Sequence, residues 1–197
     1  MKRIIVVFCF GVVTNALVRN QSIVEQCRQE KPVSNFKYPD FFKGPWFVTQ
    51  AKNISTSVCH DFYTSINSDG IINITADGYY DIGDRRDFYN VICTGPQKVQ
   101  SGTFSLTCQP KRPDAQTKNP IIVSVDVTVM EKDYNKYAVV YRCATSGSVK
   151  TDNYLVLQRN KDEEIKGLDK ILNSKGITGK LISRKQTTYI CKHEKDV

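Results

Sequence analysis

The sequence contains few of the residues on which catalysis or metal binding usually depends. It has two histidines, His60 and His193, and its seven cysteines lack the close-paired spacing of a zinc site. It contains no nucleophile–base pair and no glycine-rich phosphate loop. Glu163 and Glu164 are adjacent carboxylates, but we expect them on the solvent face of a helix. The sequence therefore predicts a protein that is not an enzyme and that holds neither a metal nor a cofactor.

Beyond its first residues the chain lacks an apolar run long enough to span a membrane. Met1-Lys2-Arg3 is basic, residues 4–13 are apolar, and Thr14-Asn15-Ala16 supplies the small residues that a signal peptidase reads. We therefore expect residues 1–16 to be a signal peptide and residues 17–197 to form one secreted domain.

The basic residues do not follow a nucleic-acid-binding pattern. The formal net charge is +8, but the lysines are dispersed and are not interleaved with aromatic residues on one element. The sequence thus predicts no nucleic-acid partner. The positive surplus favours an anionic ligand or an anionic surface instead.

The cysteines indicate disulfide bonds. Loss of the signal peptide would remove Cys9 and leave six cysteines, an even number that favours three disulfides in a secreted chain. Six cysteines allow 15 pairings, so the connectivity stays open at this point. Three sequons, at Asn20, Asn53 and Asn73, are candidate glycosylation sites wherever they are exposed.

Short β-type runs separated by turn residues make up most of the chain. We expect strands at 46–51, 58–66, 71–75, 79–82, 88–94, 102–109, 121–130, 137–143 and 153–158, with turns at 68–70, 76–78 and 95–96. The run at 121–130 alternates most clearly, with Val123 and Val125 on one face and Asp126 on the other. One amphipathic helix is expected at 162–172. This order predicts an all-β barrel with a C-terminal helix on its side.

Three short motifs punctuate these strands. Gly44-Pro45-Trp46 opens the first strand, Asp133-Tyr134 precedes the strand at 137–143, and Arg159 follows the last. In order and spacing they resemble the signatures of the lipocalin family, although Lys132 replaces the usual threonine. The resemblance implies an eight-stranded antiparallel up-and-down barrel. It also implies that Gly44, Trp46, Asp133, Tyr134 and Arg159 are structural, with the arginine packed across the tryptophan at the closed end.

Longer segments narrow the resemblance. Residues 42–49, 76–80, 137–143 and 153–162 are similar to the salivary lipocalins of blood-feeding triatomine bugs, and most of all to the pallidipin- and triplatin-like platelet inhibitors. The family pairing would give Cys27–Cys143 and Cys59–Cys191, which leaves Cys93–Cys108 as a bond between neighbouring strands.

More distant relatives, the nitrophorins, bind haem through a histidine on a barrel strand. The matching stretch here, residues 71–80, contains none. His60 and His193 lie elsewhere, so we expect them to be packing or surface residues. The sequence therefore predicts no haem.

Strand parity and the family register predict which side chains face the barrel cavity. Arg142 is the notable member of this set, because a guanidinium in an apolar cup binds a carboxylate or phosphate by paired hydrogen bonds. A register shift of one residue would instead turn Arg142 to solvent at the barrel edge. Tyr79 and Tyr80 either rim the mouth or pack in the wall. The predicted cavity residues are Val48, Gln50, Tyr79, Tyr80, Ala138, Val140, Arg142, Asn153, Leu155 and Leu157.

The resemblance implies a salivary scavenger that binds a small host mediator of platelet activation. We favour thromboxane A2 or another eicosanoid, because an apolar cup with one inward cation suits a fatty acid. A nucleotide such as ADP would need more cations, and a biogenic amine would need an inward carboxylate. Asp126 would supply one only if its strand has the opposite orientation. The alternative is an inhibitor that binds a host coagulation or contact-pathway protein through its loops. We expect a monomer in either case.

Overall fold

A computed structural model describes residues 22–53, 56–82, 85–97, 99, 101–111 and 121–186. The predicted signal peptide, the sequon at Asn20, Cys191 and His193 lie outside the described residues.

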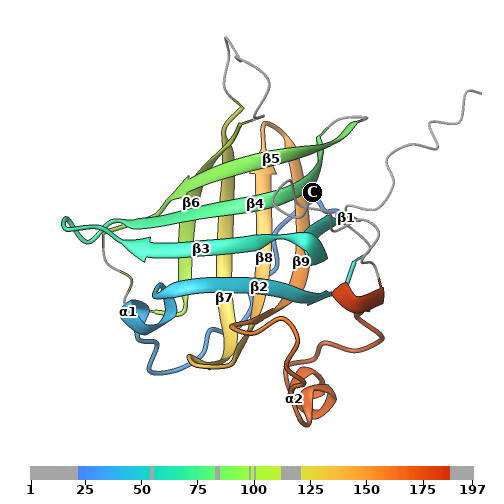
Figure 1. The fold of residues 1–197 in the computed structure, drawn as a ribbon. Helices are drawn as coiled ribbons and strands as arrows, with labels where there is room; N and C mark the ends of the chain where they lie inside the picture. Colours follow the sequence, from blue (N-terminus) through green and yellow to red (C-terminus); the bar gives the residue numbers. More distant parts are fainter. Residues whose placement is uncertain are drawn as a thin grey trace, which may run out of the picture.

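Eight strands wind into a closed antiparallel barrel (Figure 1). Each strand pairs with the next along the chain, and the last pairs back onto the first, so the prediction of an up-and-down barrel is confirmed. Two short strands extend the sheet, one against β9 and one against β2. The eight are β2 (Gly44–Ala51), β3 (Asp61–Ile66), β4 (Ile72–Ile82), β5 (Arg85–Thr94), β6 (Thr103–Lys111), β7 (Val123–Asp133), β8 (Tyr137–Ser146) and β9 (Val149–Gln158), and the short two are β1 (Ser22–Ile23) and β10 (Ile182–Ser183).

The turn predicted at residues 76–78 is wrong, because β4 is continuous through it. Gly78 stays in register opposite Tyr89. Gly78 allows the His60 ring to approach the strand closely, because a Cβ atom at this position would lie 2.9 Å from Cδ2 of His60. The glycine therefore admits the His60 ring against the strand and does not reverse the chain.

The helices also differ from the prediction. The C-terminal helix α2 spans Leu168–Ser174 and so begins six residues later than the expected start at 162. Gly167 precedes it with a φ of 73°, a left-handed conformation that separates the helix from the residues before it. Glu163 and Glu164 are exposed, but they lie in this preceding segment and not on the helix. The sequence did not predict the short helix α1 (Tyr38–Phe41) or the two 3₁₀ turns η1 (Thr56–Cys59) and η2 (Arg184–Gln186).

Two apolar clusters lie on the two sides of the barrel wall. The inner cluster fills the closed end around Phe42, Trp46 and Val129. The outer cluster packs Leu168 and Leu172 of α2 against Val139 and Val156, on the outer faces of β8 and β9. The helix therefore covers the barrel wall, as expected.

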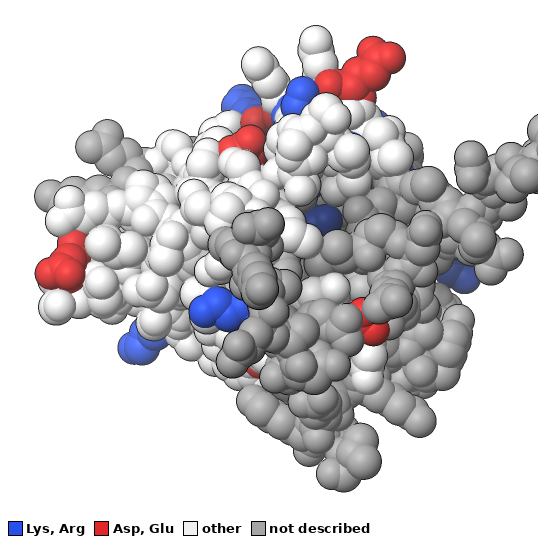
Figure 2. Space-filling model, turned by 90° about the horizontal axis from the view of Figure 1, so that it is seen from above, with Lys and Arg blue, Asp and Glu red and all other residues white. Residues whose placement is uncertain are grey.

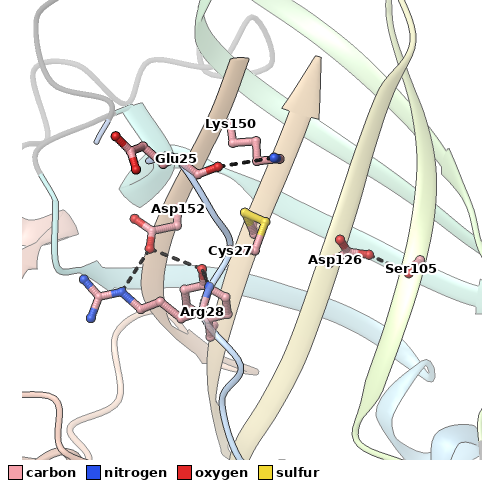
Figure 3. Close-up of a disulfide and its surroundings, with 9 residues drawn as sticks. Glu25, Cys27, Arg28, Ser105, Asp126, Lys150 and Asp152 are labelled. Carbon is pink, nitrogen blue, oxygen red and sulfur yellow. Dashed lines mark hydrogen bonds and ion pairs between the residues drawn. A yellow bond between two sulfur atoms is a disulfide. The ribbon is translucent and has the colours of Figure 1, made fainter. Parts of the chain in front are cut away.

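The N-terminal segment is fixed to the outer face of β8 and β9 (Figure 3). Cys27 forms a disulfide with Cys143, and the Arg28 guanidinium lies 3.3 Å from the carboxylate of Asp152. That carboxylate also accepts a hydrogen bond from the Tyr141 hydroxyl at 3.2 Å. The disulfide and the Arg28–Asp152 ion pair join residues more than a hundred positions apart and hold the segment on the barrel.

The predicted disulfides Cys27–Cys143 and Cys93–Cys108 are both present. The second joins directly opposed residues of β5 and β6. Cys59 is also disulfide-bonded. Because Cys191 lies outside the described residues, the pairing Cys59–Cys191 stays a prediction.

Candidate functional site

Trp46 and Arg159 close the narrow end of the barrel. Trp46 is 1% exposed, and its indole Nε1 donates to the carbonyl of Phe41 at 2.7 Å. The Arg159 guanidinium carbon lies 3.5 Å from the centroid of the indole. Its nitrogens donate to the carbonyls of Asp40, Phe41, Pro45 and Tyr134 at 2.7–3.2 Å. Burial lowers the pKa of Arg159 to about 10. The Arg159 guanidinium therefore joins α1, β2 and the β7–β8 turn.

The other signature residues shape the same end. Gly44 has a φ of 80°, which favours glycine, and its carbonyl accepts from the Thr64 hydroxyl at 2.7 Å. The Asp133 carboxylate accepts from the backbone N–H of Asn135 at 3.0 Å and orders the β7–β8 turn. The Tyr134 hydroxyl accepts from the backbone N–H of Lys37 at 2.6 Å. All these contacts are internal to the fold.

Above this closed end lies a cavity of about 390 Å³. Its walls are mainly apolar. Phe41, Trp46 and Phe104 line the cavity near the closed end, and aliphatic side chains from the strands line it above them. Ile121 and Val149, both exposed in part, belong to the same lining at the open end. Viewed from above, the surface is hollowed, and a basic side chain lies deep in the hollow (Figure 2). The volume is within the usual range for a small-molecule site.

Arg142 is the one charged side chain among the described residues that line this cavity. It lies opposite Asn153 of β9 and is flanked on β8 by the lining residues Val140 and Ala144. Its Nε is buried and has no hydrogen-bond partner among the described residues. Burial lowers the pKa of Arg142, and the charges of Tyr80 and Asp152 oppose this shift. The Arg142 side chain thus faces the lumen and not the solvent at the barrel edge.

Tyr80 is a second polar group in the cavity wall. Its hydroxyl donates to the carbonyl of Ala76 at 3.2 Å, and burial raises its pKa well above the ordinary value of a phenol. The ring stacks on buried His60 at 4.0 Å between centroids. The Nε2 atom of His60 lies 3.0 Å from the carbonyl of Tyr79. His60 is therefore a packing residue behind the wall, as expected.

Half of the predicted cavity residues line the cavity, namely Tyr80, Val140, Arg142, Leu155 and Leu157. The other five do not: Val48, Gln50, Tyr79, Ala138 and Asn153.

Gln50 lies outside the cavity because strand parity is broken in β2. The pairing of β2 with β9 shifts register between Val48 and Gln50, the mark of a β-bulge. Beyond the bulge Gln50 is opposite Val156, which belongs to the outer cluster. Gln50 therefore faces a cleft between the barrel wall and the α2 segment.

The other four predicted residues make their contacts elsewhere in the fold. Val48 and Ala138 point inward but are packed in the core of the closed end. Tyr79 packs edge-on against Phe88, its cross-strand neighbour in β5, and is not in the lining. The Asn153 amide oxygen accepts from the backbone N–H groups of Lys52 and Asn53 and so anchors the chain that follows β2.

Sequence analysis missed most of the wall formed by β3 to β7. Phe62, Ile74, Val91, Phe104 and Leu106 line the cavity without having been predicted, as does Phe41 of α1. The alternation of Phe104, Leu106 and Cys108 was a usable signal, since these residues share one face of β6. Val123, Val125 and Val127 also line the cavity, whereas Asp126 is exposed and bonds the Ser105 hydroxyl at 2.5 Å.

Among the described residues no group of three or more His, Cys, Asp or Glu side chains is arranged to hold a metal ion. None of the helices formed by the described residues is long and apolar enough to cross a membrane.

A closed up-and-down barrel, an arginine stacked on a tryptophan at its narrow end and an apolar cavity above define a lipocalin. The fold matches the tryptamine complex of the amine-binding protein of Rhodnius prolixus, with a TM-score of 0.65, 19% identity and coverage of 86% of this chain and 91% of that one. It also matches the leukotriene C4 complex of LTBP1, with a TM-score of 0.53, 27% identity and coverage of 78% and 88%.

The chain belongs to the triabin family, whose model matches residues 21–171. It is 34% identical to triafestin-2 of Triatoma infestans over 83% of this chain and 81% of that protein. It is 33% identical to triplatin of the same species, over 89% and 90%, and 28% identical to pallidipin of Meccus pallidipennis, over 88% and 89%. The resemblance to triatomine lipocalins is thereby confirmed. Proteins of this family bind ligands or inhibit other proteins and are not enzymes.

Proposed function

We propose that this protein is a salivary scavenger that sequesters an eicosanoid, of which thromboxane A2 is the leading example, and so inhibits platelet aggregation. The observation that carries the proposal is Arg142, the one cation among the described residues that line this mainly apolar cavity. An eicosanoid combines a long hydrocarbon chain with one carboxylate. The cavity offers matching parts, with apolar walls for the chain and a guanidinium for the carboxylate.

Two other classes of mediator suit the cavity less well. The phosphates of ADP would need several cations, but Arg142 is the one cation among the described lining residues. The ammonium group of an amine would need an inward carboxylate, and the described lining contains none. Asp126 is excluded from that role because its carboxylate is on the outer face, bonded to Ser105.

Relatives support the same choice. LTBP1, which is 27% identical, was solved in complex with leukotriene C4, a molecule with a fatty-acid chain. The platelet inhibitor triplatin-2 of Triatoma infestans is 30% identical over 89% of this chain and 92% of that protein. Together they favour an eicosanoid ligand and a platelet target process.

Isothermal titration of the refolded protein without residues 1–16 tests the proposal. A stable thromboxane mimic, ADP and serotonin are titrated in parallel. We expect saturable one-site binding of the thromboxane mimic and weaker or no binding of the other two. Tight binding of ADP or serotonin alone would overturn the eicosanoid assignment. If none of the three binds while clotting or platelet assays are still inhibited, the protein acts on a coagulation or contact-pathway protein instead.

A further inference from the structure

The open end of the barrel carries exposed aliphatic side chains. The exposed large apolar side chains of the described residues are Ile23, Tyr63, Ile92, Ile121, Ile122 and Val149. Tyr63 and Ile92 lie apart on β3 and β5, and the other four come from β1, the residues before β7, and β9. We call these four, Ile23, Ile121, Ile122 and Val149, the rim patch. Single exposed apolar residues are common on proteins, whereas a cluster of them indicates a binding surface.

The pairing of β9 with its neighbours brings Val149 and Ile23 together. Val149 is opposite Ser146 where β8 turns into β9, at the end of the barrel away from α1 (Figure 1). Ile23 of β1 is opposite Thr151, two residues along β9 from Val149. The two side chains therefore lie about 7 Å apart along the strands at the open end.

The start of β7 completes the rim patch on the other side of this turn. β7, β8, β9 and β1 are neighbours in the sheet in that order. Ser124 of β7 is opposite Thr145 of β8. Ile121 and Ile122 lie two and three residues before Ser124, so they are beside the β8–β9 turn that follows Thr145. The rim patch therefore occupies one continuous side of the open end.

Few charges lie beside the rim patch. Among the described residues 22–25, 108–111, 121–125 and 144–151, the charged side chains are Glu25, Lys111 and Lys150. The Lys150 ammonium donates to the carbonyl of Glu25 at 3.3 Å on the outer face of β9 (Figure 3). The carboxylates farther along the strands, Asp126 and Asp152, each have a partner. Two lysines thus flank an apolar patch, and their long stems allow the ammonium groups to reach past it.

The rim patch is continuous with the lining of the cavity. Ile121 and Val149 are 44% and 49% exposed, and both also line the cavity. Ile23 and Ile122 extend the same apolar surface outside the mouth. A hydrocarbon chain can therefore pass from the outer rim into the cavity along apolar side chains.

We propose that the rim patch docks on a lipid bilayer, with the mouth of the cavity facing the lipid. Aliphatic side chains that project beside lysines suit the membrane interface, where the apolar part enters the acyl boundary and the cations meet anionic head groups. A stable protein interface covers roughly 800 Å² on each partner, which four half-exposed side chains do not supply. Docking in this orientation would let an eicosanoid enter from the membrane without crossing water. This route of entry rests on the proposed function, whereas the docking does not.

Binding to vesicles of phosphatidylcholine and phosphatidylserine, measured by flotation of the ligand-free protein without residues 1–16, tests this proposal. The test variant carries Ile23→Gln and Ile122→Gln, because neither side chain lines the cavity. The control carries Tyr63→Gln and Ile92→Gln, which also removes two exposed apolar side chains. We expect vesicle affinity to fall at least fivefold in the test variant and less than twofold in the control. Equal losses in both, or no binding by the wild type, would overturn the proposal.

Further measurements separate the alternatives. Sedimentation should show a monomer, and self-association that the test variant abolishes, without vesicle binding, would assign the rim patch to a second copy of the chain. The thromboxane mimic should bind the test variant with unchanged affinity in lipid-free buffer, which shows that the barrel is intact. Vesicle binding should persist in Arg142→Gln, so this proposal and the eicosanoid proposal fail independently. If the double variant does not fold, Ile122→Gln is compared with Ile92→Gln.

Discussion

Two arginines of this barrel have opposite surroundings. Arg159 lies on the Trp46 ring and donates to four backbone carbonyls, so its hydrogen-bonding capacity is used within the fold. Arg142 lies in the cavity, and its Nε has no partner among the described residues. A buried nitrogen of a cation that lacks a hydrogen-bond partner destabilises the folded state, and a ligand anion would satisfy it. We therefore propose that the first arginine serves stability and that the second binds the ligand.

Replacement of Arg142 by Gln should weaken binding of a carboxylate eicosanoid at least tenfold, since hydrogen bonds to a charged group contribute about 1.5–3 kcal/mol. Trp46 is the single tryptophan and lines the cavity, so its fluorescence measures occupancy. Lys150→Gln, which removes a cation from the outer face of β9, should leave the affinity unchanged. Affinity of Arg142→Gln within twofold of the wild type would contradict the assignment.

Replacement of Arg159 by Gln should lower the free energy of unfolding by about 2–3 kcal/mol. The substitution removes the cation–π contact and several charge-assisted hydrogen bonds. Urea denaturation followed by circular dichroism measures the change. Lys161→Gln, a neighbouring exposed cation, should change it by less than about 0.5 kcal/mol. Similar stability of the two variants would show that Arg159 does not join the closed end.

At the scale of the strands, sequence reasoning succeeded wherever strand parity was regular. It placed Val140, Arg142 and Leu155 correctly, because β8 and β9 pair in register over their whole length. It failed at Gln50, because a bulge of one residue reverses the faces of a strand and leaves no clear mark in the sequence. Gly78 was wrongly predicted to be part of a turn for a related reason. The glycine is needed because His60, which lies in a different segment of the chain, approaches the strand closely at this position.

Contacts with the strands also lead to different predictions for the sequons at Asn53 and Asn73. Asn73 lies on β4 between Ser65 and Thr94, and its amide nitrogen donates locally, to the carbonyl of Ile71 just before the strand. Asn53 donates its amide to the carbonyl of Asp152, and a glycan there would disturb this contact with β9. We therefore predict a glycan on Asn73 and none on Asn53. Glycosidase treatment in water labelled with heavy oxygen, followed by mass spectrometry, would reveal each occupied site, and an occupied Asn53 would contradict the prediction.

The disulfides should contribute unequally to stability. The bond Cys27–Cys143 closes a loop with a sequence separation of 116, and Cys93–Cys108 one of 15. In the chain-entropy model, these loops are worth about 5 and about 3 kcal/mol. The double variant Cys27→Ser/Cys143→Ser should therefore unfold at lower denaturant than Cys93→Ser/Cys108→Ser. The reverse order would indicate that packing around the second bond outweighs loop entropy.

At the scale of the whole molecule, the barrel separates structure from binding along its axis. The motifs at Gly44-Pro45-Trp46, Asp133-Tyr134 and Arg159, together with the strand pattern, predicted the fold, because the closed end depends on short motifs with fixed partners. Only a small part of the cavity lining was predicted, since its shape depends on Phe41, Phe62 and Phe104 from segments without a motif.

The most direct test of the eicosanoid proposal is a crystal structure of the protein with a stable thromboxane mimic. We predict one molecule in the barrel, with its carboxylate within hydrogen-bonding distance of the Arg142 guanidinium and its hydrocarbon chain against Leu155 and Leu157. A carboxylate that points out of the mouth into solvent, or a ligand bound outside an empty barrel, would contradict the assignment.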